Sequence, residues 1–258
     1  ILSYVESQYE NVLKGTKEVI NVETRNDKIV KEIKQYGGKA GDNVELTVNS
    51  DFKNKVQKII NDCVKSIVGG KPYSPGGYAV VMNPNTGGIY ALAGVNRNVK
   101  TGKITDNALG AINQTYVMGS VVKGAMVLGA LKSGVITPSN NTLTDEPIKL
   151  KGTATKSSWF NKTGGANMSL TASDALEVSS NSYMMKLAMM EGRFNYVPGS
   201  ALSLSNSIFD KLRSNFKQFG LGVKTGIDIP GEAKGFEGPA NQAHIGNALD
   251  LSFGNYDS

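Results

Sequence analysis

The sequence predicts an α+β fold in which an antiparallel sheet is flanked by helices. Two runs with strand character, residues 78–82 and 89–93, are joined by a turn that contains Pro84 and Gly87, a pattern typical of a hairpin. Helical spacing of apolar residues recurs at residues 50–68, 120–132, 171–191 and 208–219. A hairpin and several helices within one chain are the observations that favour this fold class.

Composition and glycine placement divide the chain into two unequal parts. With 258 residues, 40% of them hydrophobic and 19% charged, the chain is globular and long enough for one large domain and a fragment of another. Residues 1–41 are rich in Lys and Glu, and glycines at positions 37, 38 and 41 mark a boundary. We therefore expect a short first part, residues 1–41, and a main domain, residues 42–258. Residues 44–48 alternate as a strand does, and Ser50 is the expected N-cap of the first long helix.

Single residues and net charge exclude or disfavour several classes of function. A single cysteine, Cys63, cannot form an intramolecular disulfide. It shares the helical spacing of the apolar residues in the first long helix, so we expect it in the hydrophobic core. The one histidine, His244, has no Cys or carboxylate cluster beside it, so we expect it to be structural or on the surface and expect no metal and no cofactor. The net charge of +6 could favour contact with anionic lipid or wall polymer, but no basic run is dense enough for nucleic acid.

A serine and a lysine three residues apart, Ser120 and Lys123, are the strongest candidates for chemistry. A glycine precedes them, and an apolar helix-forming run follows at residues 124–131. If a helix begins near Ser120, the two side chains share one face, and hydroxyl and amine come within hydrogen-bond distance. Burial lowers the proton affinity of a lysine, so a neutral Lys123 could activate Ser120 as a nucleophile. The same spacing after Ser50 and after Ser214 is expected to be structural.

A second polar cluster interrupts an otherwise apolar helical segment. Thr171 and Asp174 form a capping-box pattern that predicts a helix start. Further along the same segment three small polar residues stand in a row: Ser179, Ser180 and Asn181. Buried polar groups need hydrogen-bond partners, because an unpaired one is costly. Two explanations stay open, a break or bend in the helix, or a hydroxyl and an amide that line the same cleft as Ser120.

These two motifs, in this order and spacing, resemble the transpeptidase domain of a class B penicillin-binding protein. Residues 78–93 resemble the first hairpin of that family, residues 107–119 the approach to its nucleophile, and residues 219–232 a characteristic later segment. Val117 and Met118 stand where an acidic-Pro pair is more usual. The resemblance extends from about residue 41 to the last residue, and it implies a β-lactamase/transpeptidase-like fold.

The resemblance also implies roles for the matching residues. Ser120 would attack the carbonyl of a D-alanyl-D-alanine peptide, and Lys123 would remove its proton. Ser179 would relay a proton to the leaving amine, and Asn181 would bind the substrate amide. Two further residues are candidates for substrate binding: Ser180 and Trp159. For Trp159, which lies in a loop before the second motif, we favour core packing over stacking on a substrate.

The third motif of the family, Lys-Thr/Ser-Gly on a strand beside the active site, is expected to be missing. The tripeptide KTG begins at Lys100, Lys162 and Lys224, and we expect all three to be decoys. Lys224 is the most tempting, but it lies inside residues 219–232 and has no β-branched strand pattern around it. We therefore expect an incomplete transpeptidase domain that lacks its C-terminal part.

The resemblance implies an enzyme that cross-links peptidoglycan stem peptides and is acylated by β-lactams. Other wall-synthesis membrane proteins are its expected partners. The extracytoplasmic face of the cell membrane is its expected location. The N-terminal anchor of the family is expected to be absent from this chain, because no apolar run approaches the roughly 18 residues of a membrane span. Two alternatives stay open: a serine β-lactamase or D,D-carboxypeptidase, and a non-catalytic penicillin sensor or scaffold.

Overall fold

The computed structural model of the chain describes residues 2–67, 70 and 73–257. The chain forms two compact units. The first contains the residues up to Gln114 together with Gly226–Glu232, and the second contains Thr115–Thr225 and the residues from Ala233 onward. Strands and helices in both units give an α+β fold with antiparallel sheets and flanking helices, so the predicted fold class is confirmed.

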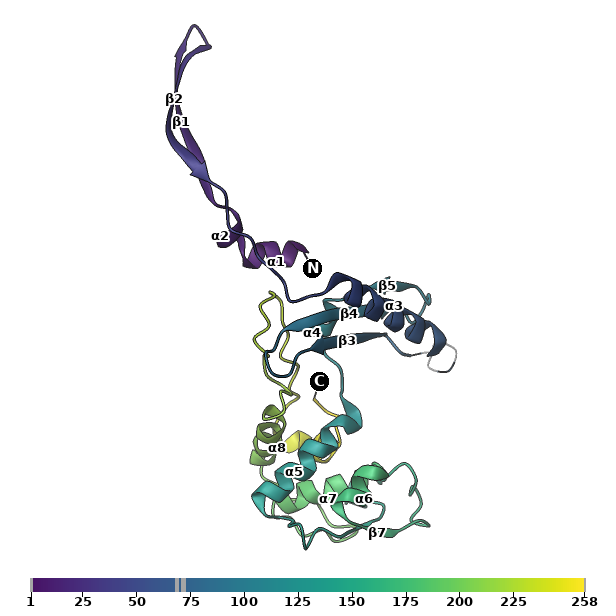
Figure 1. Cartoon of the computed structure of the whole chain (residues 1–258). Helices are drawn as coiled ribbons and strands as arrows, with labels where there is room; N and C mark the ends of the chain where they lie inside the picture. The colour runs from purple at the N-terminus through teal and green to yellow at the C-terminus, as the bar shows by residue number, and fades with distance from the viewer. Residues whose placement is uncertain (1, 68–69, 71–72, 258) are drawn as a thin grey trace. The chain divides into compact units, whose positions relative to one another are not determined.

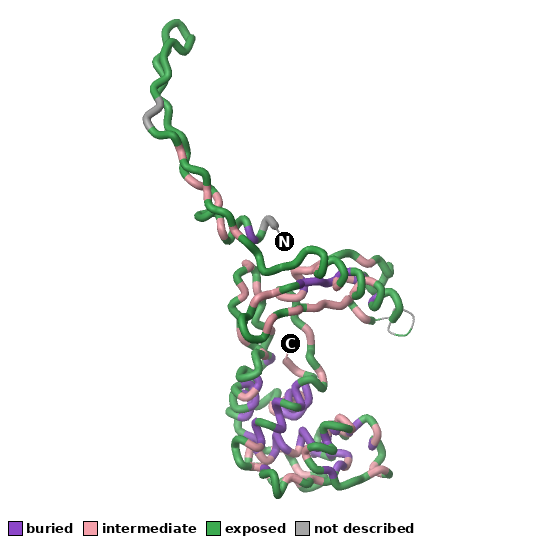
Figure 2. Tube along the Cα trace, viewed as in Figure 1, coloured by how far each residue is buried: buried purple, intermediate pink, exposed green. Residues whose placement is uncertain are grey.

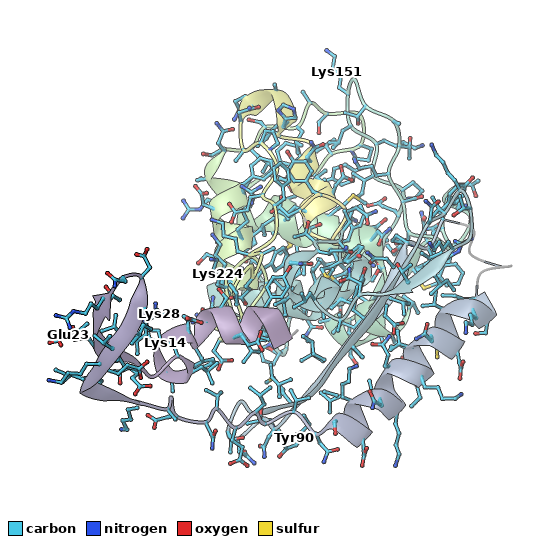
Figure 3. All side chains as sticks on the ribbon, turned by 90° about the horizontal axis from the view of Figure 1, so that it is seen from above. Lys14, Glu23, Lys28, Tyr90, Lys151 and Lys224 are labelled. Carbon is cyan, nitrogen blue, oxygen red and sulfur yellow. The ribbon has the colours of Figure 1, made fainter. Side chains whose placement is uncertain are left out.

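The first unit begins with two short helices and a long hairpin. Helices α1 (Leu2–Gln8) and α2 (Glu10–Leu13) precede strands β1 (Thr16–Arg25) and β2 (Lys28–Lys39), which pair with each other antiparallel. Every residue of β1 is exposed, and Figure 2 shows the hairpin green along most of its length. Glu23 and Lys28, which are labelled in Figure 3, are both exposed. The side chains of β1 therefore contribute almost nothing to a core.

A three-stranded antiparallel sheet carries the rest of the first unit. Its order is β3 (Gly76–Met82), β4 (Ile89–Arg97) and β5 (Ile104–Asp106), with the short helix α4 (Gly110–Asn113) after it. The predicted hairpin of strands 78–82 and 89–93 is thus confirmed as β3 and β4. Helix α3 (Ser50–Ile67) packs along this sheet, as Figure 1 shows.

Three sequence predictions in the first unit are wrong. Residues 44–48 form no strand; they run beside the start of β4, where Thr47 Oγ1 donates to Ile89 O at 2.8 Å, but they make no ladder. The N-cap of α3 is Asn49 rather than Ser50, because Asn49 Oδ1 accepts from the backbone N–H of Phe52 at 2.9 Å. Cys63 is exposed, since α3 has only one face on the sheet and its buried residues are Gln57 and Val64. Position 68 of the predicted helix lies outside the described residues.

The second unit holds the large apolar core. It contains η1 (Gly119–Val122), α5 (Lys123–Ser133), β6 (Leu143–Asp145), β7 (Met168–Leu170), α6 (Ala172–Glu177), α7 (Asn181–Glu191), α8 (Ser207–Lys217), η2 (Gln242–His244) and α9 (Asn247–Leu251). Strands β6 and β7 pair antiparallel. The buried residues of Figure 2 gather on these helices, and α7 is the most completely buried, with contacts to α5, α8 and α9. This core fixes the helix starts at which the candidate site is built.

Two of the predicted helices in this unit are confirmed and one is divided. The predictions at 120–132 and 208–219 correspond to η1 with α5, and to α8. The predicted helix at 171–191 is two helices, α6 and α7, separated at Val178–Ser180. The capping box is confirmed, with Thr171 and Asp174 bonded to each other's backbone N–H. His244 is exposed, as predicted, and its Nδ1 lies 2.8 Å from Asn241 Oδ1.

Candidate active site

Ser120 lies in a tight turn directly ahead of a buried helix. It is exposed and sits in the first turn of η1, and α5 begins three residues later at Lys123. Gly119 takes a positive φ of 63°, which a residue with a side chain rarely adopts, and its N–H donates to Gly254 O at 2.9 Å. A Cβ on Gly254 would stand 1.9 Å from Gly119 O. The turn that presents Ser120 is therefore held by two glycines from distant parts of the sequence.

Lys123 is buried and all of its donors are directed into the second polar motif. Its side chain is among the largest fully enclosed ones, and the residue is 2% exposed. Nζ donates to Ser179 O at 2.8 Å, to Ser179 Oγ at 2.9 Å and to Asn181 Oδ1 at 2.6 Å. An ammonium group has three N–H donors, so these three acceptors satisfy it.

Ser179 connects the lysine to the exposed serine. Its Oγ lies 3.0 Å from Ser120 Oγ and 2.9 Å from Lys123 Nζ, which makes a chain of amine, hydroxyl and hydroxyl. The direct hydrogen bond that the sequence predicted between Ser120 and Lys123 is not formed among the described residues. The reason is that Lys123 points toward the Ser179 turn. The Lys123 amine and the Ser120 hydroxyl are therefore linked by hydrogen bonds through the Ser179 hydroxyl.

Burial changes the acid–base chemistry of Lys123. Loss of solvation lowers the pKa of Lys123 to about 8, and the negative charge of Asp145 opposes this shift. At pH 7 about one Lys123 side chain in ten is then neutral, against fewer than about one in a thousand for an ordinary lysine. A neutral amine in a hydrogen-bonded chain to a serine hydroxyl can accept the serine proton.

The break between α6 and α7 is what aims Ser179 at the site. Ser179 adopts φ of +55°, an unfavourable conformation for a residue with a side chain, and it lies one residue before the N-cap of α7. Both explanations left open by the sequence therefore hold together, because the helix is broken and the break presents a hydroxyl to Ser120. Asn181, the first residue of α7, presents its amide oxygen to the same lysine.

Ser180 does not face the site, so its predicted role in substrate binding is wrong. It is fully buried, and its Oγ accepts from Tyr183 N at 2.9 Å as the N-cap of α7 and donates to Asp145 Oδ2. Successive side chains at this turn point to opposite sides. The partly exposed Ser179 faces Ser120, and the buried Ser180 faces the core. A side chain that caps a helix from inside the core cannot also contact a substrate.

Trp159 lies at the surface, so the favoured interpretation of core packing is wrong. It is 68% exposed, and its indole Nε1 donates to Val178 O at 2.9 Å, one residue before Ser179. Phe160 meets it edge-on at 5.6 Å between ring centroids. The indole is thus anchored beside the Ser179 turn with much of its surface accessible, and substrate contact by Trp159 stays a prediction.

Asp145 and Ser158 are site-supporting residues that the sequence reasoning missed. Both are fully buried, and they lie beneath the start of α7. No local sequence pattern marks them, since each reaches α7 only through tertiary packing. Residue type does not single them out either, because Asp145 is followed directly by Glu146, and Ser158 is preceded directly by another serine, Ser157.

The lysines of the three KTG tripeptides lie outside the helices that carry this cluster. Lys224, labelled in Figure 3, is exposed and lies outside the described helices and strands, as do the exposed Lys100 and Lys162. No group of metal-ligating side chains is found among the described residues. Within the same residues, no helix has the length and apolar character needed to cross a membrane.

The α+β fold and the Lys123–Ser179–Ser120 chain are suited to a serine acyltransferase. Residues 77–257 match the family described as penicillin binding protein transpeptidase domain. The chain therefore belongs to the transpeptidase family of penicillin-binding proteins, and the class B resemblance is confirmed.

Named relatives agree with this family. Penicillin-binding protein 2B of Streptococcus pneumoniae is 36% identical over 263 residues, covering 99% of this chain and 38% of the relative. Penicillin-binding protein 2A of Bacillus subtilis is 38% identical, covering 99% and 36%. The solved structure of penicillin-binding protein 2B from S. pneumoniae strain 5204 superposes with a TM-score of 0.85 at 35% identity, covering 98% of this chain and 42% of that one. The chain thus spans less than two fifths of the length of the curated relatives it matches.

Proposed function

We propose that this chain carries the nucleophile of a serine D,D-transpeptidase that cross-links peptidoglycan stem peptides and is acylated by β-lactams. The observation that carries the proposal is the hydrogen-bonded chain from buried Lys123 through Ser179 to exposed Ser120. A relative from Salmonella typhimurium, 26% identical over 90% of this chain, is named peptidoglycan D,D-transpeptidase MrdA. That name supports the same reaction here.

The first half-reaction forms an ester on Ser120. With Lys123 neutral, the hydroxyls reverse their donor direction, so that Ser120 donates to Ser179 and Ser179 donates to the lysine lone pair. As Ser120 Oγ bonds to the carbonyl carbon of a D-alanyl-D-alanine peptide, its proton passes through Ser179 to Lys123. The backbone N–H of Ser120, in the first turn of η1, stabilises the oxyanion.

The leaving group and the acceptor then exchange. When the carbonyl carbon–nitrogen bond breaks, Ser179 returns the proton to the amine of the departing D-alanine. An amine of a neighbouring stem peptide attacks the ester, forms the new amide and restores the Ser120 hydroxyl. Because Asn181 Oδ1 is held by Lys123, its Nδ2 group is left to donate to a carbonyl oxygen of the substrate. A β-lactam completes only the first half.

We also propose the setting of this domain. Residues 1–41 would be the end of an N-terminal pedestal domain, which the exposed strand β1 supports, and residues 42–258 would belong to the transpeptidase domain. The protein would act at the extracytoplasmic face of the cell membrane beside other wall-synthesis proteins, the setting that its membership of the penicillin-binding protein family supports.

The experiment is to map the acylated residue. The full-length protein is treated with penicillin, digested and analysed by mass spectrometry, and the adduct is expected on the peptide that contains Ser120. A Ser120→Ala variant with unchanged circular dichroism should carry none. An adduct on Ser50 or Ser214 in the wild type, or persistent labelling of Ser120→Ala, would contradict the assignment.

A further inference from the structure

A buried carboxylate lies beneath the turn that carries Ser179 and Asn181. Asp145, the last residue of β6, is fully buried, and it forms no ion pair in the part of the chain that the structure describes. Its Oδ2 accepts from Ser158 Oγ and Ser180 Oγ, both at 2.5 Å, and its Oδ1 accepts from Asn161 Nδ2 at 3.1 Å. A buried charge is costly unless it is well hydrogen bonded, so this carboxylate needs a reason to be there.

The two hydroxyls bound to Asp145 cap the first turn of α7. Ser158 Oγ accepts from Asn181 N at 3.0 Å and from Ser182 N at 3.1 Å, and Ser180 Oγ accepts from Tyr183 N at 2.9 Å. These three N–H groups have no acceptor within their own helix. Because each hydroxyl donates its proton to Asp145, both are oriented as acceptors toward the helix. The carboxylate charge near the helix N-terminus adds to this stabilisation.

We propose that Asp145 is a positioning residue for acylation, which orients the Ser158 and Ser180 hydroxyls and thereby holds Ser179 and Asn181 against Lys123. The inference rests on the proposed function of Ser120 and Lys123. Ser179 has an unfavourable backbone conformation that its surroundings must enforce, and the rigidly capped start of α7 follows it directly. Without that anchor, the three acceptors of Lys123 lose their fixed places.

The charge of Asp145 has a second effect, on the base itself. Its field raises the pKa of Lys123 against the stronger lowering caused by burial. Elements that contact α5 bear other charged side chains: Asp174, Glu177, Lys186, Glu191, Asp210, Lys211, Arg213 and Lys217. Among the described residues, Asp145 is the charged group that shifts Lys123. Lys186 forms an ion pair with Glu146, the residue after Asp145, and Lys211 forms one with Glu191.

The test is Asp145→Asn in the full-length protein, which keeps the shape of the side chain and removes the charge. The variant should be acylated by penicillin at least about tenfold more slowly at its pH plateau, equivalent to about 1.4 kcal/mol. The midpoint of the acid limb should move to lower pH, because the lysine has lost a neighbouring negative charge. A slower rate with an unmoved midpoint would overturn the electrostatic part, and an unchanged rate would overturn the positioning role.

Two matched variants separate positioning from general damage. Ser158→Ala removes a capping hydroxyl but no charge, so it should slow acylation without moving the midpoint. Glu191→Gln removes the charge of another buried carboxylate, which binds Ser133 and Lys211 away from Ser120, and should do neither. If Asp145→Asn does not give the wild-type circular dichroism, the Ser158→Ala variant tests the positioning role instead. Acylation of Ser158→Ala at the wild-type rate would overturn that role.

A readout that does not need acylation keeps this inference distinct from the proposed function. Competitive labelling of lysine amines with acetic anhydride across pH, read by mass spectrometry, gives the pKa of Lys123 in each variant. Asp145→Asn should lower the pKa of Lys123 whether or not the wild type forms a penicillin adduct. A lowered pKa together with no adduct on the wild type would contradict the proposed function but not the effect of Asp145 on Lys123. An unchanged Lys123 pKa beside a normal Ser120 adduct would sink only the electrostatic part.

Discussion

Acylation of Ser120 should level off at a much lower pH than an ordinary lysine base allows. Burial lowers the pKa of Lys123 to about 8, so the reactive neutral amine is half populated at pH 8, about a tenth at pH 7 and about a hundredth at pH 6. The acylation rate should therefore fall about fiftyfold from pH 8 to pH 6 and gain no more than about twofold above pH 8. A lysine with its usual pKa near 10.4 would instead gain about tenfold per pH unit up to about pH 10.

The assay is stopped-flow acylation of the full-length protein by a chromogenic cephalosporin between pH 6 and pH 10. Circular dichroism at each pH confirms that the fold is kept. His244 is the one histidine of the chain, and it is exposed, so His244→Gln is the control that removes the imidazole from this pH range. The profile should be the same in that variant. A rate that is flat from pH 6 to pH 9, or one that keeps rising tenfold per unit to pH 10, would refute the assignment of Lys123 as a base made neutral by burial.

Three substitutions test other parts of the site. Lys123→Ala should lower the acylation rate at least about 10²-fold with unchanged circular dichroism, since it removes the proton acceptor, and near wild-type acylation would assign the base elsewhere. Lys224→Ala should change the rate less than about threefold, because its side chain lies in an exposed loop; a loss of ten- to hundredfold would mean that it binds the substrate carboxylate. Gly254→Ala should slow acylation at least about tenfold, because its Cβ would meet Gly119 O at 1.9 Å and displace the turn before Ser120. Gly124→Ala has open space around its Cβ and is the matched control; equal rates in the two glycine variants would contradict this account.

Local patterns account for what the sequence predicted well. The capping box at Thr171 and the helix at 208–219 depend on neighbouring residues, so residue type and spacing are enough to find them. The exposed cysteine shows the limit of the same reasoning. Cys63 fits an apolar helical spacing, but only one side of α3 meets the sheet, and the sequence does not say how wide that side is.

The two halves of the site were also recognisable from short motifs, but their connection was not. The spacing of Ser120 and Lys123 predicted a direct hydrogen bond, whereas the lysine reaches Ser120 through Ser179. That route depends on the break between α6 and α7, where Ser179 takes a positive φ. A local pattern allows either a continuous helix or a break, and the packing of α7 in the core selects the break.

The sequence by itself determined the class of chemistry, because two motifs, Ser120 with Lys123 and Ser179 to Asn181, stand in an order and spacing that resemble one family. The serine–lysine spacing alone did not determine it, since the same spacing recurs after Ser50 and Ser214. Only the tertiary structure decided which hydroxyl joins Ser120 to Lys123 and which residues hold that hydroxyl. Asp145 and Ser158 stand 35 and 22 residues from Ser180, too far apart for any helical or strand period to relate them. Their contacts exist because the buried start of α7 needs acceptors for its N–H groups, and only the folded chain brings those acceptors to it.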